Sequence, residues 1–281
     1  MNKRNLVIVL VAMIFTFVGW ASGWVFADPS ETEKMAQMLK LPPNHYVQGI
    51  RNADIGSDGI TDTVILYGMK EKPEDLFVTE INVATIDGAT QAVKKSKLVD
   101  FTGYEPRIDA IVDFTGDQKP EIFIGSATGG SGGYSTYAVI DFNKNVAENI
   151  LTPEVAEGLS ISGKYADGFK AQIQLNETKE SFVIDLSSRK KEYIEEWKIF
   201  DQTGKFIEGK NETGSANEIF GYPFGALEAI DVNGDGVSEL CGTQRLIGVC
   251  NAERLSNVDS TLSYEKGKWI CIEASFRTYI R

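Results

Sequence analysis

The sequence has very few of the residues on which nucleophilic and metal-dependent enzymes commonly depend. Its 281 residues include one histidine and three cysteines, Cys241, Cys250 and Cys271. A Ser–His–Asp hydrolase needs a histidine inside the folded body. The single one, His45, lies near the start and is expected at the surface. No Cys-x-x-Cys pair occurs, which argues against the common zinc and dithiol motifs, and no disulfide pairing can be assigned.

Basic residues are scarce relative to acidic ones. From residue 28 onward the chain carries all 40 acidic residues and 26 of the 28 basic ones, since Lys3 and Arg4 come earlier; 26 minus 40 gives a net charge of −14. Nucleic acid is not an expected partner, because phosphate binding requires a basic surface. The glycine-rich stretch 125–133 is not followed by Lys-Ser or Lys-Thr, so no phosphate-binding loop is predicted.

Long hydrophobic runs are absent except at the N-terminus. Lys3 and Arg4 precede 21 almost wholly apolar residues, 6–26, and Val25-Phe26-Ala27 resembles a small-residue cleavage site. Residues 1–27 are therefore predicted to be a signal peptide or a retained signal anchor, long enough to span a bilayer. Both alternatives predict an extracytoplasmic protein, secreted or membrane-anchored at the cell envelope. It would touch the membrane only through this segment, if the segment is uncleaved.

The remainder reads as a short helix or linker over 28–46 followed by one β domain over 47–281. Met35, Met38 and Leu39 share a helical face, and Pro42-Pro43 ends the helix. A second helix is predicted over 188–200. Six segments rich in β-branched and aromatic residues predict strands: 63–67, 77–86, 121–124, 137–140, 169–175 and 182–184.

An acidic turn recurs along the β domain. The pattern Asp-x-x-x-Asp-x-x-x-(Asp/Glu) begins at Asp54, Asp113 and Asp231, each time between two predicted strands. A recurring strand–loop–strand unit is typical of propellers and other arrays. We therefore expect a mainly β fold, a propeller-like array of antiparallel strand units with one or two short helices; a β-sandwich is the alternative. The starts are 59 and then 118 positions apart, so either a middle unit around Gln172 has lost its loop or the doubling is chance.

The acidic turns are candidate Ca²⁺ sites, because Ca²⁺ accepts six to eight oxygen ligands in flexible geometry. Counted from the first Asp, positions 1, 3, 5 and 9 supply side-chain oxygens and position 7 supplies a backbone carbonyl. The predicted ligands are Asp231, Asn233, Asp235, Val237 and Glu239 in the third loop; Asp113, Thr115, Asp117, Lys119 and Glu121 in the second; and Asp54, Asp58, Ile60 and Asp62 in the first. Gly56 leaves the first loop without a ligand at position 3, so completeness ranks the loops third, second, first. Position 12 of the third loop is Gly242, which excludes an EF-hand.

These loops, with following strands such as Glu239-Leu240, resemble the FG-GAP/VCBS repeats of extracellular β-propellers, including integrin heads. More narrowly, the chain resembles exported bacterial VCBS repeat-containing proteins of unknown activity. The segments that carry the resemblance are 113–117, 129–134, 167–170, 182–187, 231–239, 244–248 and 251–252. The resemblance covers most of residues 47–277. It implies Ca²⁺ at the loops and an extracytoplasmic β fold, and it implies no known reaction.

The expected function is a calcium-stabilised, non-enzymatic binding or interaction module of the cell envelope. Its partner would be a cell-wall glycan or an envelope protein, and the Ca²⁺ would be structural. The alternative is a secreted carbohydrate-active hydrolase. Such an enzyme needs only two carboxylates, but with 40 acidic residues the sequence singles out no pair, and no catalytic residue is predicted.

Overall fold

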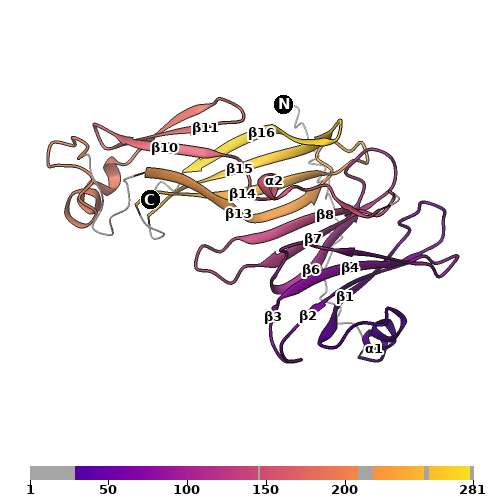
Figure 1. Cartoon of the computed structure of the whole chain (residues 1–281). Helices are drawn as coiled ribbons and strands as arrows, with labels where there is room; N and C mark the ends of the chain where they lie inside the picture. The colour runs from indigo at the N-terminus through magenta and orange to yellow at the C-terminus, as the bar shows by residue number, and fades with distance from the viewer. Residues whose placement is uncertain (1–28, 145, 208–217, 250–252, 279–281) are drawn as a thin grey trace, which may run out of the picture.

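The computed structural model describes residues 29–144, 146–207, 218–249 and 253–278. Strands dominate these ranges and form three antiparallel sheets (Figure 1), with the orders β1-β2-β4-β5, β3-β6-β7-β8-β9 and β12-β11-β10-β13-β14-β15-β16. The prediction of a mainly β fold with antiparallel strands is therefore confirmed. The predicted signal segment, residues 1–27, lies outside the described residues. Within the described ranges, no helix is long and apolar enough to cross a membrane.

The strands and helices have the following bounds. The first sheet contains β1 (His45–Ala53), β2 (Asp62–Met69), β4 (Glu80–Ile86) and β5 (Val93–Lys97). The second contains β3 (Phe77–Val78), β6 (Gly103–Val112), β7 (Glu121–Ala127), β8 (Ser135–Asp141) and β9 (Glu148–Asn149). The third contains β10 (Ile161–Ala166), β11 (Lys170–Leu175), β12 (Ser181–Asp185), β13 (Glu218–Ile230), β14 (Glu239–Ile247), β15 (Arg254–Glu265) and β16 (Lys268–Thr278). The helical segments are α1 (Pro29–Met38), α2 (Pro153–Ala156), a 3₁₀ turn (Ser187–Arg189) and a π-helical turn (Glu192–Glu196).

Each sheet contains one copy of the same four-strand unit. The first two strands of the unit flank an acidic loop, and two further antiparallel strands follow, giving β1-β2-β4-β5, β6-β7-β8-β9 and β13-β14-β15-β16. The doubled spacing before the third loop comes from an insertion between β9 and β13. Its strands β10, β11 and β12 have no acidic loop and extend the third sheet through pairing of β10 with β13. Gln172 lies in β11 of this insertion.

The sheets stack on one another, and α1 covers the outer face of the first (Figure 1). This stacking buries both faces of the first sheet, as strand β2 shows: its side chains alternate between the two faces, and both are buried. Ile65 and Tyr67 pack with Met35 and Leu39 of the α1 region, whereas Val64 and Leu66 pack with residues of the second sheet. The opposite face of the second sheet, including Phe123 and Val139, packs against the third together with Phe114 of the loop after β6. Each fully buried large side chain contributes about 1.5–3 kcal/mol.

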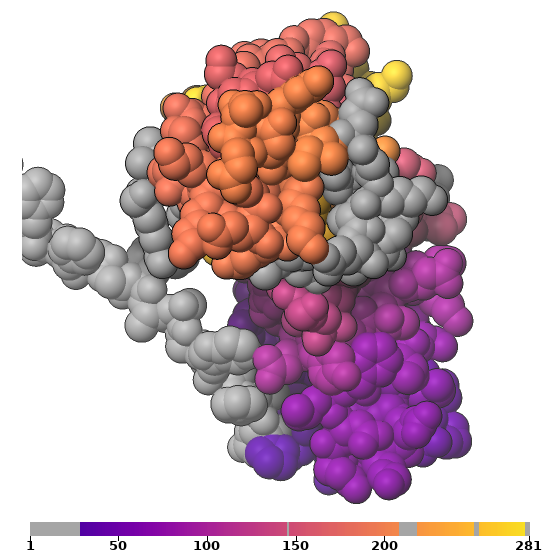
Figure 2. All heavy atoms as spheres, turned by 90° about the vertical axis from the view of Figure 1, so that its left-hand side faces the viewer, coloured from indigo at the N-terminus to yellow at the C-terminus, as the bar shows by residue number. Residues whose placement is uncertain are grey.

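The third sheet curls until its two edge strands meet. Phe182 of β12 stacks on Phe276 of β16 with ring centroids 4.7 Å apart, although β12 and β16 are the terminal strands of the seven. The resulting nearly closed, barrel-like sheet surrounds an aromatic core that includes Tyr193, Phe200 and Phe224. In the end-on view of Figure 2 this body (orange) sits above the first two sheets (indigo to magenta).

Several details differ from the sequence-based expectations. The segment 77–86, predicted as one strand, forms β3 and β4 in different sheets. The segment predicted as one helix over 188–200 forms only the 3₁₀ turn and the π-helical turn, and the short helix α2 was not predicted. His45 starts β1 and is half-buried, with its side chain 11% exposed, rather than fully exposed at the surface. Cys241 and Cys271 are both free and half-buried, while Cys250 lies outside the described residues.

Candidate metal centre and a polar groove

The three acidic loops adopt the same conformation, because the same backbone groups donate hydrogen bonds to the same carboxylates. The position-1 aspartate accepts a bond from the N–H of position 6, which is Gly59 (2.8 Å), Gln118 (2.7 Å) or Gly236 (2.9 Å). The position-5 aspartate accepts a bond from the N–H of position 7, which is Ile60 (2.8 Å), Lys119 (2.9 Å) or Val237 (2.8 Å). The position-9 carboxylate accepts a bond from the N–H of position 2, which is Ile55 (2.8 Å), Phe114 (2.8 Å) or Val232 (3.1 Å).

Backbone dihedrals give a second, independent sign of this equivalence. Position 6 has a positive φ in every loop, 83° at Gly59, 66° at Gln118 and 93° at Gly236. Position 4 does as well, with 54° at Ser57, 76° at Gly116 and 79° at Gly234. The expectation that Gly236 adopts a positive φ is confirmed. Gln118 shows that the loop geometry imposes this conformation even where glycine is missing, at a steric cost that glycine avoids.

Each loop buries its position-9 carboxylate at its base and exposes the carboxylate at position 5. The position-9 side chains are buried, with 6% exposure for Asp62, 0% for Glu121 and 4% for Glu239. Their neighbours at position 5, Asp58, Asp117 and Asp235, are exposed. A buried carboxylate requires compensating partners. Besides the N–H of position 2, Asp62 accepts bonds from the N–H groups of Gly56 (3.3 Å) and Gly88 (2.8 Å).

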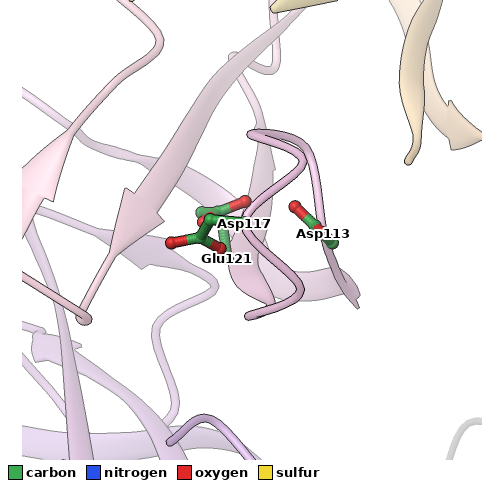
Figure 3. Close-up of side chains that lie close together, drawn as sticks. All are labelled: Asp113, Asp117 and Glu121. Carbon is green, nitrogen blue, oxygen red and sulfur yellow. The ribbon is translucent and has the colours of Figure 1, made fainter. Parts of the chain in front are cut away.

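The second loop brings its carboxylates closest together. Oxygens of Asp113, Asp117 and Glu121 lie within 4.8 Å of one another, the only such group of at least three acidic, histidine or cysteine side chains among the described residues. Figure 3 shows Asp117 beside Glu121, with Asp113 facing them from the other side of the loop. Thr115, the predicted ligand at position 3, donates its hydroxyl to Glu121 over 3.4 Å. Burial, assisted by the charges of Asp141, Asp113 and Asp117, raises the pKa of Glu121 to about 7.

In the first and third loops the predicted ligands are present but less tightly gathered. In the third loop the amide nitrogen of Asn233 lies 3.0 Å from Asp235 Oδ2. Hydrogen bonds from backbone N–H groups, first that of Gly236, lower the pKa of Asp231. The sequence ranked the third loop first by ligand count, whereas the geometry favours the second as the candidate metal centre.

The loops also contact one another, which the sequence did not reveal. The hydroxyl of Ser57 in the first loop donates to the carbonyl oxygen of Gln118 in the second over 2.8 Å. The N–H of Ser238 in the third loop donates to the carbonyl oxygen of Asp113 over 2.7 Å. Neither serine is a predicted ligand, and no local motif distinguishes either of them. The three loops thus form one continuous row.

A polar groove runs along β13, outside the loops. Two cavities of ≈ 320 Å³ each share the lining residues Ala226 and Glu228 and therefore adjoin along β13. One is lined by Arg107, Asp109 and Tyr137 of the second sheet, and the other by Thr243, Asp259 and Glu273 of the third. None of these residues was predicted as a site residue. The only sequence signal is a pair of charges, Arg107 and Asp109, within a strand.

Two ion pairs hold charged side chains in the groove. Arg107 Nε lies 2.6 Å from Asp109 Oδ1, and Arg277 Nη2 lies 2.6 Å from Asp259 Oδ1. Thr243 donates its hydroxyl to the same Asp259 oxygen over 2.6 Å. Burial raises the pKa of Asp109; Arg107 opposes this shift and the charge of Glu228 adds to it.

Comparison with known proteins finds similarity to YybI proteins rather than to the expected VCBS or FG-GAP repeat proteins. The model of the YybI C-terminal domain family matches residues 159–277, which span the third sheet from just before β10 into β16. The uncharacterized protein YybI of Bacillus subtilis (strain 168) is 28% identical over 215 residues, covering 75% of this chain and 77% of that protein. No solved structure matches this chain.

The identification as a VCBS or FG-GAP repeat protein is therefore wrong, because the family match is to the YybI C-terminal domain and no VCBS or FG-GAP family matches. The error has a physical cause. A nine-residue acidic turn is dictated by oxygen spacing and backbone geometry, so unrelated families can share it. The chain is similar to YybI over most of its length and to the YybI C-terminal domain over its third sheet.

Proposed function

We propose that this protein is an extracytoplasmic, non-enzymatic binding module whose three acidic loops bind structural Ca²⁺. The proposal includes a propeller-like arrangement of the three four-strand units, with the loops in equivalent positions. A glycan or protein of the cell envelope would be the partner. The location outside the cytoplasm rests on the apolar N-terminal sequence.

The observation that carries the metal proposal is the threefold recurrence of one hydrogen-bonded loop. In each copy the carboxylates at positions 1, 5 and 9 accept bonds from the N–H groups of positions 6, 7 and 2. Solubility alone requires acidic side chains but not this common geometry. Oxygen ligands without nitrogen or sulfur favour a hard cation such as Ca²⁺.

The expected size of the effect indicates a structural role. For a dissociation constant near ~10⁻⁴ M and roughly millimolar free Ca²⁺, each site stabilises the fold by about 1.4 kcal/mol. Two or three such sites together contribute about 3–4 kcal/mol, a large part of a typical 5–15 kcal/mol.

The test is thermal unfolding of the whole chain in EDTA and in millimolar Ca²⁺. We expect EDTA to lower the melting temperature by several degrees and Ca²⁺, added in excess, to restore it. Mg²⁺ at the same concentration is the control, since it demands a smaller octahedral shell. A melting curve that is the same at micromolar and millimolar Ca²⁺ contradicts the proposal.

The non-enzymatic part is tested separately by incubating the protein with cell-wall polysaccharide. The alternative, a hydrolase with a carboxylate pair, predicts new reducing ends that disappear when one carboxylate is replaced by its amide. Our proposal predicts none.

A further inference from the structure

We propose that the groove along β13 is a binding site for a carbohydrate chain without carboxylates, either neutral or amine-bearing. This inference deepens the proposed binding function by naming the site and the ligand class. It does not depend on the metal loops, because no residue that lines the groove is a predicted metal ligand.

Backbone irregularities shape this groove from both sides. The register of β6 against β7 shifts between Ile108 and Ala110, so Asp109 lies at a bulge. The register of β13 against β14 shifts between Phe224 and Ala226, so Gly225 lies at another. Both bulge residues line the same cavity. Bulges re-aim side chains and are frequent beside binding and active sites.

Glycine and alanine leave room for the polar groups. A Cβ added to Gly125 of β7 would lie 2.3 Å from Asp109 Oδ2 and 3.1 Å from an Arg107 nitrogen. The ion pair between Arg107 and Asp109 therefore occupies the space that a side chain at Gly125 would fill. Gly225, Ala226 and Gly242 line the groove as well, and such small residues let a ligand approach the backbone.

The charges in the groove select the ligand class. Asp109 and Asp259 are neutralised by Arg107 and Arg277. Among described residues, no ion pair involves Glu228 or Glu273. These two carboxylates accept hydrogen bonds and repel anions. Ring hydroxyls and amino groups donate to them, whereas a uronic-acid chain would bring like charges close together.

Hydroxyl and aromatic side chains complete the recognition surface. Thr243, Thr261 and Ser275 lie along the groove beside Asp259 and Glu273. The other part of the groove is lined by Tyr137, whose ring stacks on that of Phe123 with centroids 5.7 Å apart. Tyrosine rings offer an apolar face with a polar edge, which suits a sugar ring.

The experiment measures binding to the full chain by isothermal titration calorimetry. The probes are a β-1,4-linked N-acetylglucosamine hexamer, its deacetylated amine form and an oligogalacturonate of equal length. The groove variants are Glu228→Gln, which removes one charge, and Ala226→Trp, which fills the junction of the two cavities at an exposed backbone position. Matched controls are Glu71→Gln and Ala89→Trp, at exposed positions outside the groove.

We expect the N-acetylated and amine hexamers to bind and the oligogalacturonate to bind at least about tenfold more weakly. Each groove variant should weaken binding by about tenfold or more, while the controls bind like the unaltered chain. If the groove variants bind as tightly as the control variants, the groove is not the binding site. The proposed binding function would then still stand, with its site elsewhere in the protein. Binding of none of the probes, or preference for the oligogalacturonate, overturns the ligand class. The Ca²⁺ dependence of the melting temperature, measured for every variant, reports independently on the metal loops.

Discussion

At the residue scale, the side chains with the largest electrostatic consequences are buried carboxylates. Glu253 is fully buried and accepts bonds from the hydroxyl of Tyr165 and the N–H of Val249, each over 2.7 Å. A Cβ on Gly248 would lie 2.0 Å from the Tyr165 oxygen, so glycine is needed beside this pair. Burial raises the pKa of Glu253 despite these bonds, because desolvation penalises its charged form.

This raised pKa predicts a pH-dependent stability that Glu253→Gln removes. A carboxyl group with a folded pKa above its unfolded value binds its proton more tightly in the native state. Its contribution is fully present below the unfolded pKa and is lost as pH rises through the folded pKa. Within that window we expect the difference in unfolding free energy between wild type and variant to change by about 1.4 kcal/mol per pH unit. Urea denaturation from pH 4.5 upward measures it, and parallel pH profiles for both proteins would contradict the prediction.

A second residue-scale prediction concerns the candidate metal centre. Asp117→Asn removes an exposed charge from the group formed with Asp113 and Glu121, so it should lower the Ca²⁺-dependent stabilisation by about 1.4 kcal/mol, the expected contribution of one site. The measurement is the unfolding free energy with and without Ca²⁺. Asp100→Asn, at an exposed position in the turn after β5, is the control, and an equal Ca²⁺ effect in both variants would count against a metal in the second loop.

At the element scale, features set by neighbouring residues could be predicted from the sequence. Features that depend on contacts between strands far apart in the sequence could not. The apolar character of β2 and the acidic turns after β1, β6 and β13 are local features, so this strand and the loops were predictable. The π-helical turn at Glu192–Glu196 depends on the packing of Tyr193 into the third sheet's core, which no periodicity reports. The groove was hidden for a similar reason, since the bulges at Asp109 and Gly225 exist only relative to partner strands.

Closure of the third sheet gives an element-scale prediction. Phe182→Ala removes the stacking of β12 on Phe276 of β16, so we expect the unfolding free energy to fall by about 2 kcal/mol, less than for a fully buried phenylalanine. Val183→Ala is the matched control, because the adjacent side chain is 60% exposed and should change stability by less than about 0.5 kcal/mol. Urea denaturation of both variants checks the difference. An equal loss of unfolding free energy in both variants would mean that the contact between the edge strands β12 and β16 does not stabilise the protein.

At the scale of the whole molecule, the three four-strand units are not self-contained repeats, because the second and third sheets share one hydrophobic core. The YybI C-terminal domain match begins at residue 159, yet the third sheet does not complete its own core. Phe114, Phe123 and Val139 of the second unit belong to the same hydrophobic cluster as Leu227 and Leu240. Trp269 of β16 also donates its indole N–H to the carbonyl oxygen of Ile150 over 3.0 Å.

These contacts predict that the third sheet depends on the second for its stability. A fragment of residues 159–281 should lose the apolar cover supplied by Phe114 and Phe123 and the Trp269 bond to Ile150. We expect it to unfold at a lower urea concentration than the whole chain and to bind an apolar dye such as ANS. A fragment of residues 29–158, added in equal amount, should suppress the dye signal by covering the exposed face again. Equal urea midpoints for fragment and whole chain would show instead that the matched region is an independent domain, with the second sheet attached rather than shared.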